Sequence, residues 1–347
     1  MLLFRCRRLT VYALALAGAN ACGRLPGSRP ATASVWLLPA PEEGLGLRRA
    51  GISPGIAVFE GDLIVIDSST LRPAQRKTDA RGTPDCCTVG KHPDGTTSRV
   101  ALVTTYQGAR YHPESIRALT EDPEVVATFA GSLGRLASEN NGGLFIDFQG
   151  DTPDELSKTT SILRVIADSA RGHGLRPIGI VVPPGDTIGY PTGVLARIAD
   201  LIVVRLHGEH RMGTSPGPLV SPEWMTRQIG IRAYDIGVNR LVAELPLFGY
   251  RWNPDGSVTS ITYSEAQALV RSESGVFRRD PASGSLTASS ARSRWTIWIQ
   301  DAETLRKLVT IARREGVHRF ALLGVAGADP AIWTDLPAAL RRPANRR

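Results

Sequence analysis

Asp147 and Gln149 are the side chains of this chain whose type and spacing are best suited to chemistry. They end an apolar run at Leu144–Phe148. In a strand, alternate side chains share one face, so Asp147 and Gln149 point the same way as Phe145. If the run is a strand of a parallel barrel, both lie at its carboxyl end, where barrel active sites form. A carboxylate and an amide there predict a cleft that hydrogen-bonds a polar ligand.

A weak metal pattern follows another apolar run. His207 and His210 are three residues apart, with Glu209 between them. This spacing lies in an expected loop, where it is poorly suited to holding a metal ion. We therefore expect no metal and no cofactor.

The elements that would position these residues alternate along the chain. Helical segments follow most of the apolar runs: one begins with Asp122 as N-cap, one with a capping box at Thr152–Glu155, and one at Asp301. This alternation over some 300 residues predicts an α/β fold, a single (β/α)8 TIM barrel, with a doubly wound sheet as the alternative. The expected strands contain Val35–Leu38, Ile56–Val58 with Leu63–Ile66, Val100–Thr104, Leu144–Phe148, Pro177–Val182, Leu201–Leu206, Leu241–Phe248 and Phe320–Val325.

The alternation is interrupted after the seventh strand. Residues 251–300 are rich in Ser, Thr and Gly, and they contain a helix pattern at Ser264–Arg271 and a strand pattern at Trp295–Ile299. We interpret this stretch as a small inserted α+β subdomain. The barrel is expected to span residues 34–340, followed by a basic tail at 341–347.

Several segments, in a fixed order, carry a resemblance to a known family. They are Gly143–Gln149 (GLFIDFQ), Ala199–Val204, Ser215–Pro218 with Trp224, Arg240–Trp252, Trp298–Asp301 with Leu305 and Lys307, and Asp329–Pro330 with Trp333. Together they resemble the family-18 glycoside hydrolases, the family of chitinases and peptidoglycan hydrolases, and most closely its spore-cortex type. The fourth strand of that family usually reads D-G-x-D-x-D-x-E.

The resemblance implies a barrel that acts on polymers of 2-acetamido sugars. In active members the sugar's own acetamido oxygen is the nucleophile, so they are exceptions to the usual scheme of two carboxylates. The last Glu of the motif protonates the leaving oxygen, and the Asp two residues earlier orients the acetamido N–H. A Tyr on the sixth strand bonds the acetamido carbonyl, and a Trp on the eighth strand lies under the sugar.

This sequence departs from that machinery at several positions. The acid position holds Gln149, whose amide cannot give up a proton, and general acid catalysis contributes on the order of 10²–10⁴-fold. The sixth strand ends Arg205–Gly208, which leaves His207 at the Tyr position to bond an acetamide. Leu323 stands where the eighth-strand Trp is expected. Only Asp147 of the central set remains, which predicts a scaffold that has lost its reaction.

Glu244 leaves two interpretations open. Acids at the ends of the fourth and seventh barrel strands form a pair in other barrel glycosidases, so Glu244 could replace the missing acid beside Asp147. The alternative is a salt bridge with a residue such as Arg205.

Aromatic residues at the expected carboxyl ends of the strands could stack on sugar rings or pack in the core. Tyr250 and Trp252 follow the seventh strand and are the preferred stacking candidates; Tyr106 follows the third.

The amino-terminal segment reads as a targeting signal. Three arginines precede a short apolar run at Leu9–Ala19, and small residues then lead to Cys22. The run is too short to span a bilayer. We predict a signal peptide of the lipoprotein type over residues 1–22, a flexible tether over 23–33, and lipidation of Cys22, with plain secretion as the alternative. Cys86 and Cys87 are two loop thiols or a strained vicinal disulfide.

The positive charge lies at the two ends of the chain. The net charge of +8 includes Arg5, Arg7 and Arg8 near the start and four arginines in the last seven residues, so the body is nearly neutral. This distribution argues against a nucleic-acid partner.

Three functions remain open for an exported, monomeric protein. The first is an impaired hydrolase that binds a 2-acetamido-sugar polymer of the chitin or peptidoglycan type. The second is an active glycosidase with a substitute acid, and the third is a scaffold that binds a protein.

Overall fold

The computed structural model describes residues 34–38, 57–66, 73–75, 99–107, 110–120, 122–139, 141–149, 156–325 and 327–341. The expectations for residues 1–33 with Cys22, for Cys86 and Cys87, for the capping box at 152–155 and for residues 342–347 of the basic tail lie outside these residues. They stay predictions. No helix within the described ranges is both long enough and apolar enough to cross a bilayer.

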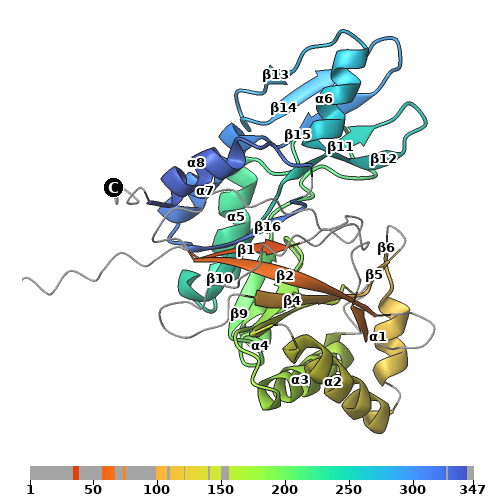
Figure 1. Cartoon of the computed structure of the whole chain (residues 1–347), viewed down its shortest axis with the longest axis vertical. Coiled ribbons are helices and arrows are strands. Elements are labelled where there is room, and N and C mark those ends of the chain that lie inside the picture. Colours follow the sequence, from red (N-terminus) through yellow and green to blue (C-terminus); the bar gives the residue numbers. More distant parts are fainter. Residues whose placement is uncertain are drawn as a thin grey trace, which may run out of the picture. The chain divides into compact units, whose positions relative to one another are not determined.

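The described residues form a closed barrel of parallel strands (Figure 1). The first strand pairs in parallel with both the second and the last, which closes the ring. The (β/α)8 prediction is confirmed, and each strand overlaps an apolar run predicted from the sequence. In chain order the strands are β1 (Ser34–Leu38), β2 (Ala57–Ile66), β4 (Arg99–Thr104), β7 (Gly143–Asp147), β8 (Ile178–Val182), β9 (Leu201–Arg205), β10 (Leu241–Pro246) and β16 (Arg319–Leu323).

Two short additions flank the early strands. Strand β3 (Pro73–Gln75) pairs antiparallel with the end of β2. Strands β5 (Tyr106–Gln107) and β6 (Arg110–Tyr111) form a small hairpin directly after β4, at the carboxyl end of the barrel.

Helices connect the strands and begin where the sequence places caps. Asp122 accepts a hydrogen bond from the backbone of Glu124, and Asp301 from that of Thr304, as expected of N-caps. In Figure 1, α2 and α3 lie side by side. The helices are α1 (Pro113–Thr120), α2 (Pro123–Ser138), α3 (Leu156–Gly172), α4 (Thr192–Leu195), α5 (Pro222–Ala233), α7 (Ala302–Arg314) and α8 (Ile332–Arg341), with a 3-10 turn η2 at Val238–Arg240.

The interior of the barrel is a packed core. Side chains such as Trp36, Phe145 and Val203 fill it, while the other face of each strand packs against the helices. Phe145 is fully buried and needs a glycine opposite: a Cβ on Gly179 would lie 2.5 Å from the Phe145 ring. Because Asp147 is two residues beyond Phe145, it lies above this core at the open end of the barrel.

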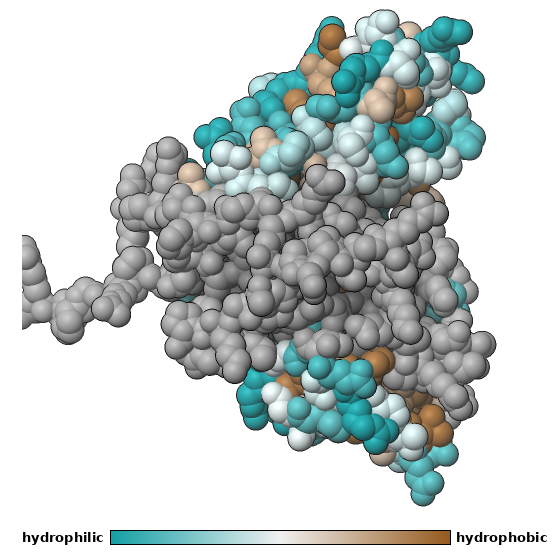
Figure 2. Space-filling model, viewed as in Figure 1, coloured by the Kyte–Doolittle hydropathy of each residue, from teal (hydrophilic) through white to brown (hydrophobic). Residues whose placement is uncertain are grey.

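The inserted subdomain has its own antiparallel sheet, in the order β12-β11-β15-β14-β13. Its own core includes Ile261, Trp295 and Ile297. The visible face of the subdomain in Figure 2 is largely hydrophilic, with single apolar residues rather than a broad patch. Its elements are β11 (Phe248–Trp252), β12 (Val258–Thr262), α6 (Tyr263–Ser272), β13 (Arg278–Arg279), β14 (Leu286–Ser289) and β15 (Thr296–Ile299).

Candidate functional site

Asp147 and Gln149 meet at the carboxyl end of β7. The amide Nε2 of Gln149 donates a hydrogen bond of 2.7 Å to Oδ1 of Asp147. Both side chains are buried, with 3% and 9% of their surface exposed. No hydrogen bond within the described residues reaches the carbonyl oxygen of Gln149. The amide nitrogen is therefore committed to Asp147, and the amide oxygen is the atom left to face a ligand.

The second oxygen of Asp147 accepts from three neighbours. Oδ2 lies 2.8 Å from a guanidinium nitrogen of Arg205, 2.9 Å from the Tyr111 hydroxyl and 3.3 Å from the Thr104 hydroxyl. Thr104 is the register partner of Asp147 on β4, and Tyr111 is reached through the β5–β6 hairpin. Asp147 is therefore the hub of a buried hydrogen-bond network.

Arg205 bridges the two sides of the barrel mouth. Its Nε donates to Oε1 of Glu244 at 3.0 Å, so one guanidinium joins Asp147 on β7 to Glu244 on β10. It also donates to the Tyr111 hydroxyl and lies 5.5 Å from the centre of that ring. The salt bridge between Glu244 and Arg205, one of the two sequence interpretations, is present. We call Thr104, Tyr111, Asp147, Gln149, Arg205, His207 and Glu244 the mouth cluster.

The charges of the mouth cluster determine which members hold a proton. Burial alone raises the pKa of Glu244, but the charge of Arg205 and the interactions with His207 together outweigh burial and lower this pKa to about 2. Burial lowers the pKa of Arg205, but Asp147, Tyr111 and Glu244 raise it well above its usual value. Burial raises the pKa of Tyr111 well above its usual value. At neutral pH, Glu244 has no proton to give and Tyr111 holds its proton too firmly to act as a general acid.

His207 is the polar side chain of the cluster with the weakest partner. Its Nε2 is 3.5 Å from Oε1 of Glu244, longer than a well-formed hydrogen bond, and has no other partner within the described ranges. Burial lowers the pKa of His207, so the imidazole is neutral near pH 7. Its ring packs edge-on against Phe248, with ring centres 5.5 Å apart.

The aromatic candidates differ in how open they are. Phe248, Tyr250 and Trp252 lie on one face of β11 and contact one another edge to face. Trp252 is only 7% exposed, and its indole N–H donates to the backbone carbonyl of Thr214. Tyr250 is half-buried. Tyr106 packs edge-on against Tyr111, with ring centres 5.0 Å apart. Tyr250 is therefore the more open of the two preferred stacking rings.

The structure separates the residues of the weak metal pattern. Both carboxylate oxygens of Glu209 accept from Ser221, and Nδ1 of His210 is 2.9 Å from the carbonyl of Ser215. Across the described ranges, no group of three His, Cys, Asp or Glu side chains is arranged to hold a metal ion.

Two members of the cluster, Thr104 and Tyr111, are missing from the candidates singled out in the sequence. Thr104 ends β4, the third barrel strand, and Tyr111 follows it closely. Their position near the carboxyl end of that strand was the signal that could have identified them. Leu323, at the end of β16, packs into the barrel core.

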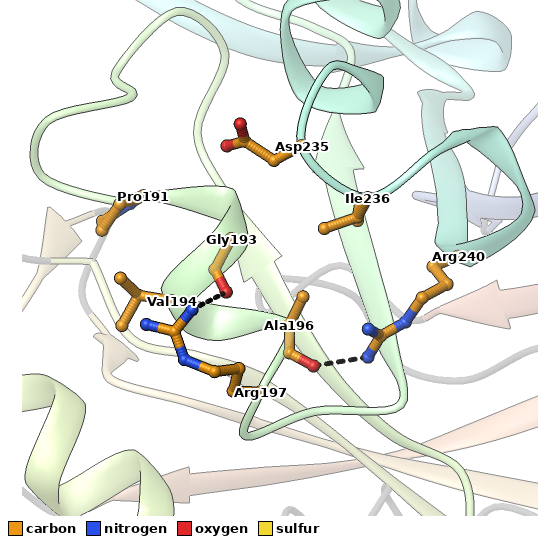
Figure 3. Close-up of a pocket in the computed structure, with 8 residues that line it drawn as sticks. All are labelled: Pro191, Gly193, Val194, Ala196, Arg197, Asp235, Ile236 and Arg240. Carbon is orange, nitrogen blue, oxygen red and sulfur yellow. Dashed lines mark hydrogen bonds between the residues drawn. The ribbon is translucent and has the colours of Figure 1, made fainter. Parts of the chain in front are cut away.

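A surface pocket lies away from this cluster (Figure 3). It is formed by α4 and by residues 235–240, which lead into the amino ends of β9 and β10, and no member of the mouth cluster lines it. Arg197 and Arg240 donate to the carbonyls of Gly193 and Ala196 at its wall. The pocket and the mouth are thus separate features.

Comparison with known proteins gives relatives of one kind. No family model matches the chain. An uncharacterized glycosylase, YvbX of Bacillus subtilis, is 19% identical over 248 residues, which cover 67% of this chain and 72% of that protein.

Similar solved structures are also of enzymes named for acting on glycans. A chitinase from Chromobacterium violaceum has a TM-score of 0.69 and 17% identity, covering 89% of this chain and 99% of its own. The spore cortex-lytic enzyme SleL of Bacillus megaterium has a TM-score of 0.70 and 14% identity, covering 92% and 77%. The chain therefore has the barrel fold of chitinases and cortex-lytic glycosidases, as the sequence resemblance predicted.

Proposed function

We propose that the chain is a family-18-like barrel that binds a polymer of 2-acetamido sugars and has lost hydrolysis. One observation supports the loss of hydrolysis: no side chain of the mouth cluster is placed to protonate a leaving oxygen. Gln149 occupies the acid position, and its amide is tied to Asp147. Glu244 is held ionised by Arg205, with its pKa lowered to about 2. This argues against Glu244 as the substitute acid.

The proposed ligand follows from the relatives and from the free carbonyl oxygen of Gln149. Similar barrels are named as chitinases and a cortex-lytic enzyme, whose polymers, chitin and peptidoglycan, contain 2-acetamido sugars. At the mouth, the carbonyl oxygen of Gln149 can accept from a sugar hydroxyl or N–H. The ring of Tyr250 can cover an apolar sugar face.

Retention on insoluble chitin and on peptidoglycan tests the binding half of the proposal. The full chain should be retained, and Gln149→Leu should weaken retention because leucine cannot hydrogen-bond the glycan. Gln267→Leu is the matched control, since Gln267 donates to Tyr263 within the inserted subdomain. Equal loss in both variants, or no retention of the unmodified protein, would favour the scaffold that binds a protein.

Hydrolysis of aryl N-acetylglucosaminides and of peptidoglycan tests the catalytic half. We expect no turnover above background, and Gln149→Glu alone should not restore full activity, because His207 and Leu323 also depart from the active pattern. Robust turnover that Asp147→Asn abolishes would replace this proposal with an active glycosidase.

We further propose an exported protein held at the membrane by a lipid on Cys22. The support is the basic, apolar and small-residue order that ends there. Metabolic labelling with a fatty acid should label the protein, and Cys22→Ser should remove the label. An unlabelled, cleaved protein would indicate plain secretion.

A further inference from the structure

The guanidinium of Arg205 occupies the centre of the barrel mouth. From the end of β9 it reaches Asp147 on β7 and Glu244 on β10, with N···O distances of 2.8 and 3.0 Å. The side chain is only 12% exposed. Any group that is to lie between Asp147 and Glu244 must therefore displace it.

The guanidinium resembles in shape the acetamido group that a 2-acetamido sugar would place between Asp147 and Glu244. Both are planar, with one sp² carbon bonded to three heavy atoms. Both present N–H donors in that plane, and a carboxylate such as Asp147 accepts from either. Arg205 already makes with Asp147 the hydrogen bond that an acetamido N–H would make.

Several contacts hold Arg205 in this place. Besides the two carboxylates, it donates to the Tyr111 hydroxyl and lies over that ring. A planar guanidinium bound on several sides loses little further freedom per hydrogen bond, and its removal would leave two buried carboxylates unpaired. A neutral sugar offers no positive charge to replace it.

We propose that Arg205 is an internal occupant of an acetamide-shaped slot, and that a glycan lies across the rim of the mouth without inserting its N-acetyl group. Arg205 thereby determines which ligands the mouth admits: polymers that contact the rim at several points, and not short sugars that depend on the slot. This inference rests on the proposed function for the identity of the ligand as a glycan.

Opening the slot tests the proposal. In Arg205→Met/Glu244→Gln, the guanidinium and the charge of Glu244 are removed together, while Asp147 keeps its bonds from Gln149, Tyr111 and Thr104. The probe is the disaccharide of N-acetylglucosamine, measured by titration calorimetry on the full chain. We expect roughly 10- to 100-fold tighter binding than in the unmodified protein, the range of one hydrogen bond to a charged group.

Two matched variants identify the source of any gain. Arg227→Met/Glu223→Gln makes the same chemical change in an exposed pair on α5, at 3.2 Å, and should leave disaccharide binding unchanged. Adding Asp147→Asn to the opened variant should abolish the gain, because the carboxylate that would receive the acetamido N–H is gone. If the opened variant does not fold, Arg205→Lys keeps one positive charge but vacates the planar slot, and a gain of several-fold is expected.

The outcomes separate this proposal from the proposed function. Disaccharide binding that stays equal or weakens in a folded, opened variant overturns the internal occupant, even if the unmodified protein is retained on chitin. Tight disaccharide binding by the unmodified protein overturns it as well. Failure of the unmodified protein to bind either polymer overturns the proposed function alone, since a gain in the opened variant would still support the slot.

Discussion

Two buried arginines differ in the partners that their guanidinium groups bind. Arg205, in the mouth cluster, binds the carboxylates of Asp147 and Glu244. Arg232, on α5, is fully buried and binds backbone carbonyls of the loop that follows β8, at Pro183, Asp186 and Tyr190. All three guanidinium nitrogens of Arg205 have partners, whereas Nε of Arg232 is buried without one among the described residues. Only Arg205 has its charge neutralised directly by its hydrogen-bond partners.

The difference appears in how firmly each arginine keeps its proton. The acids around Arg205 raise its pKa well above its usual value. Burial lowers the pKa of Arg232 to about 10, although the charge of Asp186 opposes this. Carbonyl dipoles stabilise a buried cation less than carboxylates do. Arg232 therefore serves to hold a loop, whereas Arg205 determines the charge state of the barrel mouth.

The largest effect is expected when Arg205 alone is removed. Arg205→Met leaves Glu244 and Asp147 without their cation, and breaking a buried pair costs about 3–5 kcal/mol of unfolding free energy. Arg205→Met/Glu244→Gln should recover much of that loss. Urea denaturation of the two variants measures both values. If the single variant is as stable as the unmodified protein, the ion pairs of the mouth do not contribute to stability as described.

Acidification should act on the mouth through Glu244. Its folded-state pKa of about 2 lies below the usual 4.5, so it adds stability above pH 4.5 that is lost as pH falls toward 2. The full contribution is about 3 kcal/mol. Urea unfolding between pH 5 and 3 should show the loss, and Glu244→Gln should flatten it. An unchanged slope in that variant would assign the acid sensitivity to other groups.

Removal of Arg232 should have a smaller and local effect. Arg232→Met leaves several carbonyls of the β8–α4 loop without a donor, with a cost of about 1–3 kcal/mol. Hydrogen exchange should quicken at Gly189, whose N–H donates to Asp186 in that loop. Arg197→Met is the control: Arg197 is exposed and donates to a single carbonyl, so we expect a change within about 0.5 kcal/mol.

The smallest effect concerns His207. Burial lowers its folded-state pKa below the usual 6.5, so the unfolded chain takes up a proton first as pH falls. Stability should therefore decline slightly from about pH 6.5 down to that lowered pKa. The melting temperature at pH 7.5 and 5.5 measures this, and His207→Gln should reduce the difference. In this window Glu244 remains ionised, so the two contributions can be separated.

Local sequence patterns were sufficient to predict the barrel strands and a helix start of this protein. The apolar runs predicted the barrel strands because a strand buried on both faces must be nearly all apolar. Asp122 was predicted as an N-cap because the first amides of a helix need an acceptor. Asp147 and Gln149 were placed together because their spacing matches the strand period.

Other features depended on contacts between distant segments. Trp252 was a candidate for sugar stacking, but its indole donates to Thr214, 38 residues earlier, and is buried. Tyr111 reaches Asp147 across 36 residues through a two-stranded hairpin, a contact that strand periodicity does not encode.

The alternating apolar runs were enough to predict a barrel, and the resemblance to family-18 hydrolases implied an amide at the acid position. The direction of Arg205 could be known only from the folded chain. Its partners are 39, 58 and 94 residues away, and its direction depends on the closure of the barrel, which brings the ends of β7, β9 and β10 around one guanidinium. A hydrogen bond requires its atoms to be placed within a few tenths of an ångström, and that placement comes from the packed fold as a whole.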